Sequence, residues 1–186
     1  MQSALGGRDK IASVRDFEEC IRGDGWSDNG KYQGVSYKRT RWITPETVRI
    51  DQAGLSNYVL FFNGTSGWEI LPDKGFAQLA GEELDFAQGY ANGVDVRAWL
   101  GDRNPENVFT SPKRNVISVS RGKRDTLHKT EIILDPTTFL PKSESSIFLI
   151  DAKHPIATQT RQFEDWTEFQ GVSFRAESSI FIGAQK

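Results

Sequence analysis

The chain has 186 residues, a formal net charge of −2 and a single cysteine, and no apolar run approaches the roughly 20 residues of a membrane-spanning helix. This length suits one domain with a sizeable core, and 37% hydrophobic and 26% charged residues are typical of a globular protein rather than a disordered one. The slightly acidic balance argues against nucleic-acid binding as the main task. The lone Cys20 allows no internal disulfide and is expected to be a small buried apolar side chain.

A short helix and then five strands are predicted for the first part of the chain. Leu5, Ile11 and Val14 can form a narrow apolar stripe, which predicts an amphipathic helix over residues 4–14. Alternating stretches bounded by turn residues such as Asn29-Gly30 predict strands. These strands are expected over residues 17–26, 32–42, 47–52, 57–63 and 67–71.

A helical segment followed by five more strands is predicted for the rest. Within residues 81–101 the apolar side chains recur at helical spacing, which favours one or two helices interrupted at Gly89 and Gly93. A loop is expected over residues 107–112. The later strands are expected over residues 115–120, 126–134, 142–150, 158–169 and 172–182.

The order of these elements predicts the fold class. Long sequential strands joined by short turns favour a meandering antiparallel sheet, and one twisted sheet of about ten strands tends to curl. Two helices are too few to cover both faces of a flat sheet. We therefore predict a mainly β, α+β fold: a half-open, strongly curved antiparallel β-barrel with a helical lid or plug, forming a single domain over residues 1–186.

The sequence holds no residue pattern that is typical of a catalytic or metal site. His128 and His154 lack the spacing of a metal-binding pair, and a hydrolase or metal site built on either one is the rival hypothesis. Ser66 does not lie in the Gly-x-Ser-x-Gly pattern of a nucleophile elbow. The basic residues 121–124 are followed by Asp125, which favours a solvated hairpin tip over nucleic-acid contact. We predict a protein that is not an enzyme, needs no cofactor or metal, and binds no nucleic acid.

Three motifs in order give the chain a family resemblance. Residues 61–73 read Phe-Phe-Asn-Gly-Thr-Ser-Gly-Trp-Glu-Ile-Leu-Pro-Asp, a strand, a turn and a tryptophan strand. Residues 133–141 read Ile-Leu-Asp-Pro-Thr-Thr-Phe-Leu-Pro, and residues 163–174 end on Gln-Gly-Val-Ser-Phe. With the opening residues 4–10, this order resembles periplasmic outer-membrane lipoprotein carriers and lipoprotein-sorting proteins, the lipoprotein localisation factor-like fold.

The resemblance implies a location, a function and a set of partners. The location would be the periplasm or outer cell envelope, with a signal peptide removed. The function would be a non-catalytic carrier or sorting role, in which a lipid or lipoprotein acyl chain is bound in an apolar cavity. The chain would be a monomer with peripheral contacts to other envelope proteins. The alternative is an envelope sensor or interaction domain on the same fold that binds another protein.

Four residues are the predicted ligand-binding set. Trp99 lies on the expected lid, and Phe62 and Trp68 flank the matched hairpin, so these three are expected to line the cavity. Their other interpretation is ordinary core packing. The carriers that the chain resembles use an arginine ahead of a proline to hold the lid, and Arg41, ahead of Pro45, is the nearest match.

Overall fold

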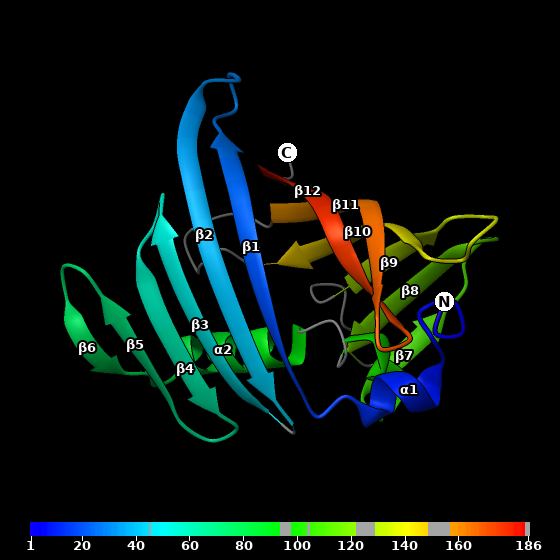
Figure 1. The fold of residues 1–186 in the computed structure, drawn as a ribbon, viewed down its shortest axis with the longest axis horizontal. Coiled ribbons are helices and arrows are strands. Elements are labelled where there is room, and N and C mark those ends of the chain that lie inside the picture. Colours follow the sequence, from blue (N-terminus) through cyan, green and yellow to red (C-terminus); the bar gives the residue numbers. More distant parts are fainter. Residues whose placement is uncertain (45, 94–97, 104, 122–128, 149–156, 185–186) are drawn as a thin grey trace. The chain divides into compact units, whose positions relative to one another are not determined.

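The computed structural model describes residues 1–44, 46–93, 98–103, 105–121, 129–148 and 157–184 (Figure 1). The chain forms two compact units. One is Val14–Ala98; the other, called the terminal unit below, joins Met1–Ser13 to Trp99–Lys186. That the chain folds as one domain stays a prediction.

The Val14–Ala98 unit is a six-stranded antiparallel sheet followed by one helix. The strands are β1 (Asp16–Trp26), β2 (Tyr32–Ile43), β3 (Thr47–Gly54), β4 (Tyr58–Asn63), β5 (Gly67–Leu71) and β6 (Gly75–Gln78), and the helix is α2 (Glu82–Gly93). The sheet order follows the chain order because each strand is joined to the next by a short turn.

Helix α2 covers one face of this sheet, which we call the covered face. The helix lies against β3 and β4, and its Ala87 and Ala91, one turn apart, are fully buried. A Cβ placed on Gly67 would lie 3.3 Å from a methyl carbon of Leu84, which shows how closely the helix approaches. The core on the covered face consists of Trp42, Val48, Ile50, Leu60 and Phe62. The opposite face, which carries the side chains of alternate residues, is called the open face.

The terminal unit is a second six-stranded antiparallel sheet, in the order β12-β11-β10-β9-β8-β7. Its elements are α1 (Arg8–Ser13), the 3₁₀ helix η1 (Gly101–Arg103), β7 (Asn107–Thr110), β8 (Val116–Arg121), β9 (Lys129–Leu134), β10 (Pro141–Phe148), β11 (Ala157–Phe169) and β12 (Val172–Ala184). The first residues of the chain belong here because Leu5 is fully buried and its carbonyl oxygen accepts a 3.0 Å hydrogen bond from the amide of Ser173.

The predicted half-open barrel with a helical lid is wrong. The strands form two separate antiparallel sheets, and α1 and α2 belong to different units. The physical reason lies between β6 and β7. A meander extends a sheet only while short turns join its strands, and here a helical segment takes the place of that turn. Neither described helix is long and apolar enough to span a lipid bilayer.

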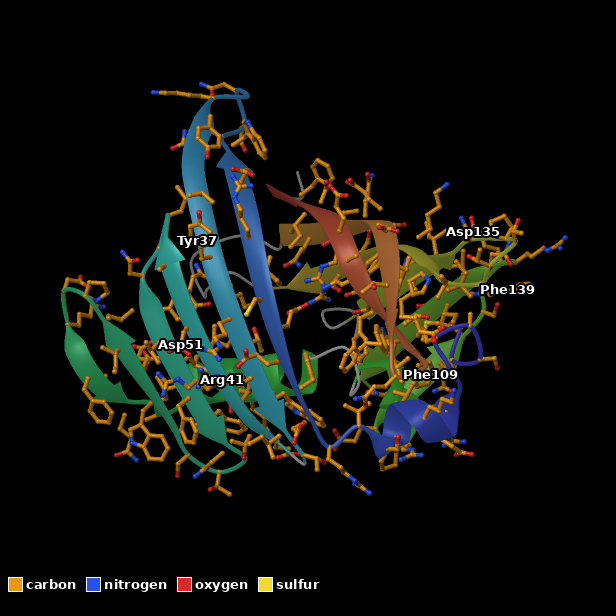
Figure 2. All side chains as sticks on the ribbon, viewed as in Figure 1. Tyr37, Arg41, Asp51, Phe109, Asp135 and Phe139 are labelled. Carbon is orange, nitrogen blue, oxygen red and sulfur yellow. The ribbon has the colours of Figure 1, made fainter. Side chains whose placement is uncertain are left out.

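Asp135 closes the hairpin between β9 and β10, whose tip carries Asp135 and Phe139 (Figure 2). Its Oδ1 atom accepts hydrogen bonds from the amides of Thr138 (2.8 Å) and Thr137 (2.9 Å). These bonds favour the charged carboxylate and hold the pKa of Asp135 below its ordinary value. The turn is therefore stabilised by the ionised form of this side chain.

Asp135→Asn is expected to reveal this contribution through its pH dependence. The asparagine oxygen can accept the same bonds without charge, so the wild type should be more stable at neutral pH. A lowered pKa gives stability that is present above the unfolded pKa and lost as pH falls through the folded pKa. The advantage over Asp135→Asn should therefore shrink as the pH falls below about 4, the ordinary pKa of an aspartate. Urea unfolding at neutral pH and at acidic pH below that value checks this, and a constant difference would contradict it.

Candidate functional site

Two cross-strand rows of side chains run across the open face from β1 to β6. Residues directly opposite one another in adjacent strands point to the same face. The first row is Cys20, Arg39, Asp51, Val59, Ile70 and Phe76. The second row is Glu18, Arg41, Arg49, Phe61, Trp68 and Gln78. Both rows are mainly charged over β1 to β3 and mainly apolar over β4 to β6, so one sheet face has two chemically different halves.

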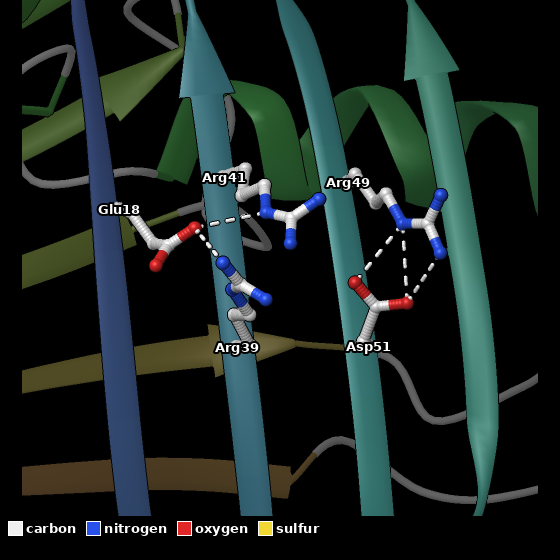
Figure 3. A network of polar contacts seen from close by, with 5 residues as sticks. All are labelled: Glu18, Arg39, Arg41, Arg49 and Asp51. Carbon is white, nitrogen blue, oxygen red and sulfur yellow. Dashed lines mark hydrogen bonds and ion pairs between the residues drawn. The ribbon is translucent and has the colours of Figure 1, made fainter.

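The charged half is an ion-pair network, shown in Figure 3 with α2 behind the strands. Oε2 of Glu18 lies 2.6 Å from Nη2 of Arg39 and accepts a 2.9 Å hydrogen bond from Nε of Arg41. Arg49 donates to both carboxylate oxygens of Asp51 at 2.7 to 3.1 Å. Arg39, and after it Arg41, lowers the pKa of Glu18, and Arg49 lowers the pKa of Asp51, so both carboxylates stay ionised.

This network carries a surplus positive charge. Three guanidinium groups share two carboxylates, and one oxygen of Glu18 serves two of the arginines. The side chains are about half exposed, and ion pairs in such a setting add little to stability. The cluster is therefore better suited to binding an anion than to stabilising the sheet.

The apolar half lies over β4, β5 and β6. The rings of Phe61 and Trp68 are 5.4 Å apart between centroids, and both side chains are half-buried. Beside them Ile70 is 47% exposed and Phe76 is 68% exposed, directly opposite each other on β5 and β6. Neighbouring exposed apolar side chains of this size mark a surface whose burial against a ligand or a partner is favourable in free energy.

A hollow of about 480 Å³ lies over β1 to β3, with Val59 of β4 at its border. On the open face it is lined by side chains of Cys20, Arg22, Tyr37, Arg39, Asp51, Ala53 and Val59. The remaining lining residues, Ile21, Lys38 and Gln52, alternate with these along the strands, and their side chains point to the other face. The hollow thus combines an apolar floor with two arginines and one aspartate.

The structure separates Phe62 from Trp68. Phe62 is 1% exposed and lies on the covered face, opposite Gly67 in the ladder. Trp68 is opposite Phe61 and lies on the open face. The two predicted lining residues therefore cannot line one cavity, because the sheet itself lies between them.

Trp99 and Arg41 belong to different units. Trp99 is buried in the terminal unit, where its ring lies 6.1 Å from Trp166 and 5.7 Å from Phe174. Arg41 is on β2, in the other unit, where it contacts Glu18. Figure 2 shows Arg41 beside Asp51 on the neighbouring strand. Whether these residues bind a ligand stays a prediction.

Sequence reasoning missed most of the open face. Cys20 is exposed, so the expectation of a buried thiol is wrong. Glu18, Cys20 and Arg22 alternate along β1, and Tyr37, Arg39 and Arg41 alternate along β2. This alternation of polar side chains on two adjacent strands was the sequence signal that could have identified the charged half of the open face. The apolar half could not be found in this way because β6 was not predicted.

His128, His154 and the basic residues 121–124 carry the other sequence hypotheses. Both histidines and residues 122–124 lie outside the described residues. In the part of the chain that the structure describes, no group of three or more potential metal ligands is found.

Comparison with known proteins shows similarity of fold without similarity of sequence. No family model matches the chain, and no curated protein matches it. An outer membrane lipoprotein-sorting protein domain from Vibrio parahaemolyticus superposes with a TM-score of 0.57 at 8% identity, over 97% of this chain and 84% of that chain. A DUF1329 family protein from Desulfovibrio piger gives a TM-score of 0.56 at 11% identity, with the same coverage. The resemblance found in the sequence motifs is confirmed at the level of fold: the chain is similar in fold to an outer membrane lipoprotein-sorting domain.

Proposed function

We propose that the protein is a non-catalytic binding protein of the cell envelope that holds the acyl chain of a lipid or lipoprotein on the open face of the β1–β6 sheet. The observation that carries this proposal is the apolar half of that face, where Ile70 and Phe76 are exposed opposite each other on β5 and β6. The similarity in fold to a lipoprotein-sorting domain supports the envelope location and the acyl-chain ligand.

Packing supports this position for the proposed site. On the covered face, α2 already occupies the apolar surface, since Phe62 and Val48 have almost no exposed area. On the open face, Phe76 keeps most of its surface exposed. An acyl chain lying there would gain about 0.8 kcal/mol for each buried CH₂ group. Several such groups suffice for measurable affinity after the cost of ordering the chain.

Phe76→Ser is expected to weaken binding about tenfold or more without changing stability. The substitution removes most of an exposed aromatic side chain, whose burial against a ligand is worth about 1.5–3 kcal/mol. The measurement is a titration with a fluorescent fatty acid or an acylated peptide, followed through the fluorescence of the probe and of the protein's tryptophans. Urea unfolding should give the wild-type midpoint.

Phe169→Ser is the matched control, because Phe169 is 65% exposed but lies on β11 in the terminal unit. This variant should bind the probe as the wild type does. Absence of saturable binding to the wild type would refute the proposed function. If both variants weaken probe binding equally, the binding site does not lie on the open face.

A protein-binding module is the second candidate, and a specific observation favours it. Strand β6 is the last strand in the sheet order, and it displays Phe76 beside a backbone edge. A partner strand could pair with this edge and cover the ring. Purification from envelope extract separates the two candidates: copurifying lipid supports the proposed function, and a stoichiometric protein partner that depends on Phe76 supports the module.

A further inference from the structure

We propose that the open face is a site for an anionic single-chain amphiphile, with the head group at Arg39 and Arg41 and the tail across β4 to β6. This inference rests on the proposed function and narrows its ligand to an acyl chain that ends in an anionic oxygen acid. It follows from the placement of the charged and apolar halves on one face of one sheet.

The arrangement of the first row gives the ligand its direction. Arg39, Asp51, Val59, Ile70 and Phe76 are consecutive partners across β2 to β6. Strands lie about 4.8 Å apart, so four spacings from β2 to β6 span about 19 Å. That length is sufficient for an extended acyl chain to lie across the strands, with one end at a guanidinium group and the other at an exposed phenyl ring.

The charges select an anion over a cation at the β2 end. In the part of the chain that the structure describes, Glu18 is ion-paired with Arg39 and Arg41. The second acid of the network, Asp51, is ion-paired with Arg49, and its charge also acts on the two other arginines. Among the described residues, Arg41 donates to Glu18 through Nε alone, and Figure 3 shows its two terminal nitrogens on the side away from Glu18. These donors are available to a second oxygen acid, and guanidinium groups bind carboxylates and phosphates through paired donors.

The hollow gives the head group a defined place. Arg39, Tyr37 and Asp51 line it, and Asp51, which stays ionised, is ion-paired with Arg49. Cys20, the partner of Arg39 on β1, lines the same hollow and is exposed. A ligand whose head group contacts Arg39 would therefore cover this thiol.

The test compares three probes with the same tail: dodecanoate, dodecyl phosphate and the neutral dodecanol. Binding is followed below the micelle concentration, at about pH 8 where the carboxylate is ionised. The second readout is the rate at which Cys20 reacts with a thiol reagent. The anionic probes should bind about tenfold or more tightly than dodecanol and should slow the reaction of Cys20. Comparing dodecanoate with dodecyl phosphate distinguishes a fatty-acid head group from a phosphate head group.

Arg39→Gln should abolish the preference for the anionic probes while leaving dodecanol binding unchanged. Arg114→Gln, an exposed arginine between β7 and β8 in the terminal unit, should keep the preference. If all three probes bind the wild type equally, the inference is wrong and the proposed function stands. If none binds, the proposed function fails and the inference fails with it. Anionic preference that survives Arg39→Gln and leaves Cys20 unprotected would place the head group elsewhere and overturn the inference.

Discussion

Phe62→Ala is expected to lower the free energy of unfolding by about 3–5 kcal/mol, one of the two largest effects that the structure predicts. Phe62 is 1% exposed on the covered face, where it lies in a cross-strand row with Trp42 and Val48. Removing the ring leaves a cavity under α2 that neighbouring side chains fill only in part. Urea unfolding followed by circular dichroism measures the loss.

Phe61→Ala is the matched control because Phe61 is the preceding residue and points to the open face. It is half-buried, so the loss of stability should be only about 1–2 kcal/mol. Acyl-chain binding should show the reverse order, with Phe61→Ala weakening it and folded Phe62→Ala retaining it. Comparable stabilities for the two variants would contradict the assignment of the covered and open faces.

The strands themselves were largely predictable from the sequence. The alternation that predicts residues 67–71 matches β5, and strands were correctly expected at most other positions. Two strands were missed. The four residues of β6 follow a Pro-Asp-Lys-Gly turn and are too few to show alternation. The four residues of β7 lie between Pro105 and Pro112, and the segment therefore looked like a loop.

The number of sheets was not predictable from alternation. Period two indicates which residues share a face, but it does not indicate where a sheet ends. One or two helices were expected within residues 81–101, where α2 lies, yet the effect of a helix on the topology depends on which unit it packs against. The same limit applies to residues 1–13, which pack with the C-terminal half through contacts such as Leu5 with Ser173.

The hairpin register places Phe62 and Trp68 on opposite faces of the sheet, and whether either residue binds a ligand stays a prediction. Phe62 and Trp68 flank one turn, and proximity in sequence suggested a shared cavity. The ladder places Phe62 opposite Gly67 and Phe61 opposite Trp68, so a shift of one residue separates the two faces. The hydrogen bond from the amide of Asn63 to the carbonyl of Ser66 (3.0 Å) closes the turn and fixes that register. If the turn had been predicted to contain the four residues from Asn63 to Ser66, the sequence would have predicted this pairing.

Gly6→Ala is expected to destabilise the terminal unit by about 3 kcal/mol. Gly6 has φ of +111°, and a Cβ at this position would lie 2.1 Å from the carbonyl oxygen of Gly171. This obstacle is backbone in the turn between β11 and β12, so the N-terminal segment itself must move. Movement would break the bond between Leu5 and Ser173 and expose Leu5, whose burial alone is worth about 1.5–3 kcal/mol.

Gly7→Ala is the control that measures the cost of backbone strain without the steric clash at Gly6. Gly7 also has a positive φ of +97°, but a Cβ there would meet no atom within 4 Å. Its cost should be only the strain of an alanine at positive φ, about 1 kcal/mol. Thermal unfolding of both variants, with hydrogen exchange at the amide of Ser173, measures the difference. If the Ser173 amide stays protected in Gly6→Ala and both variants lose the same stability, the first residues of the chain are not held against the β11–β12 turn. Faster exchange in Gly6→Ala alone would show that the start of the chain is held in place by its contact with the C-terminal hairpin.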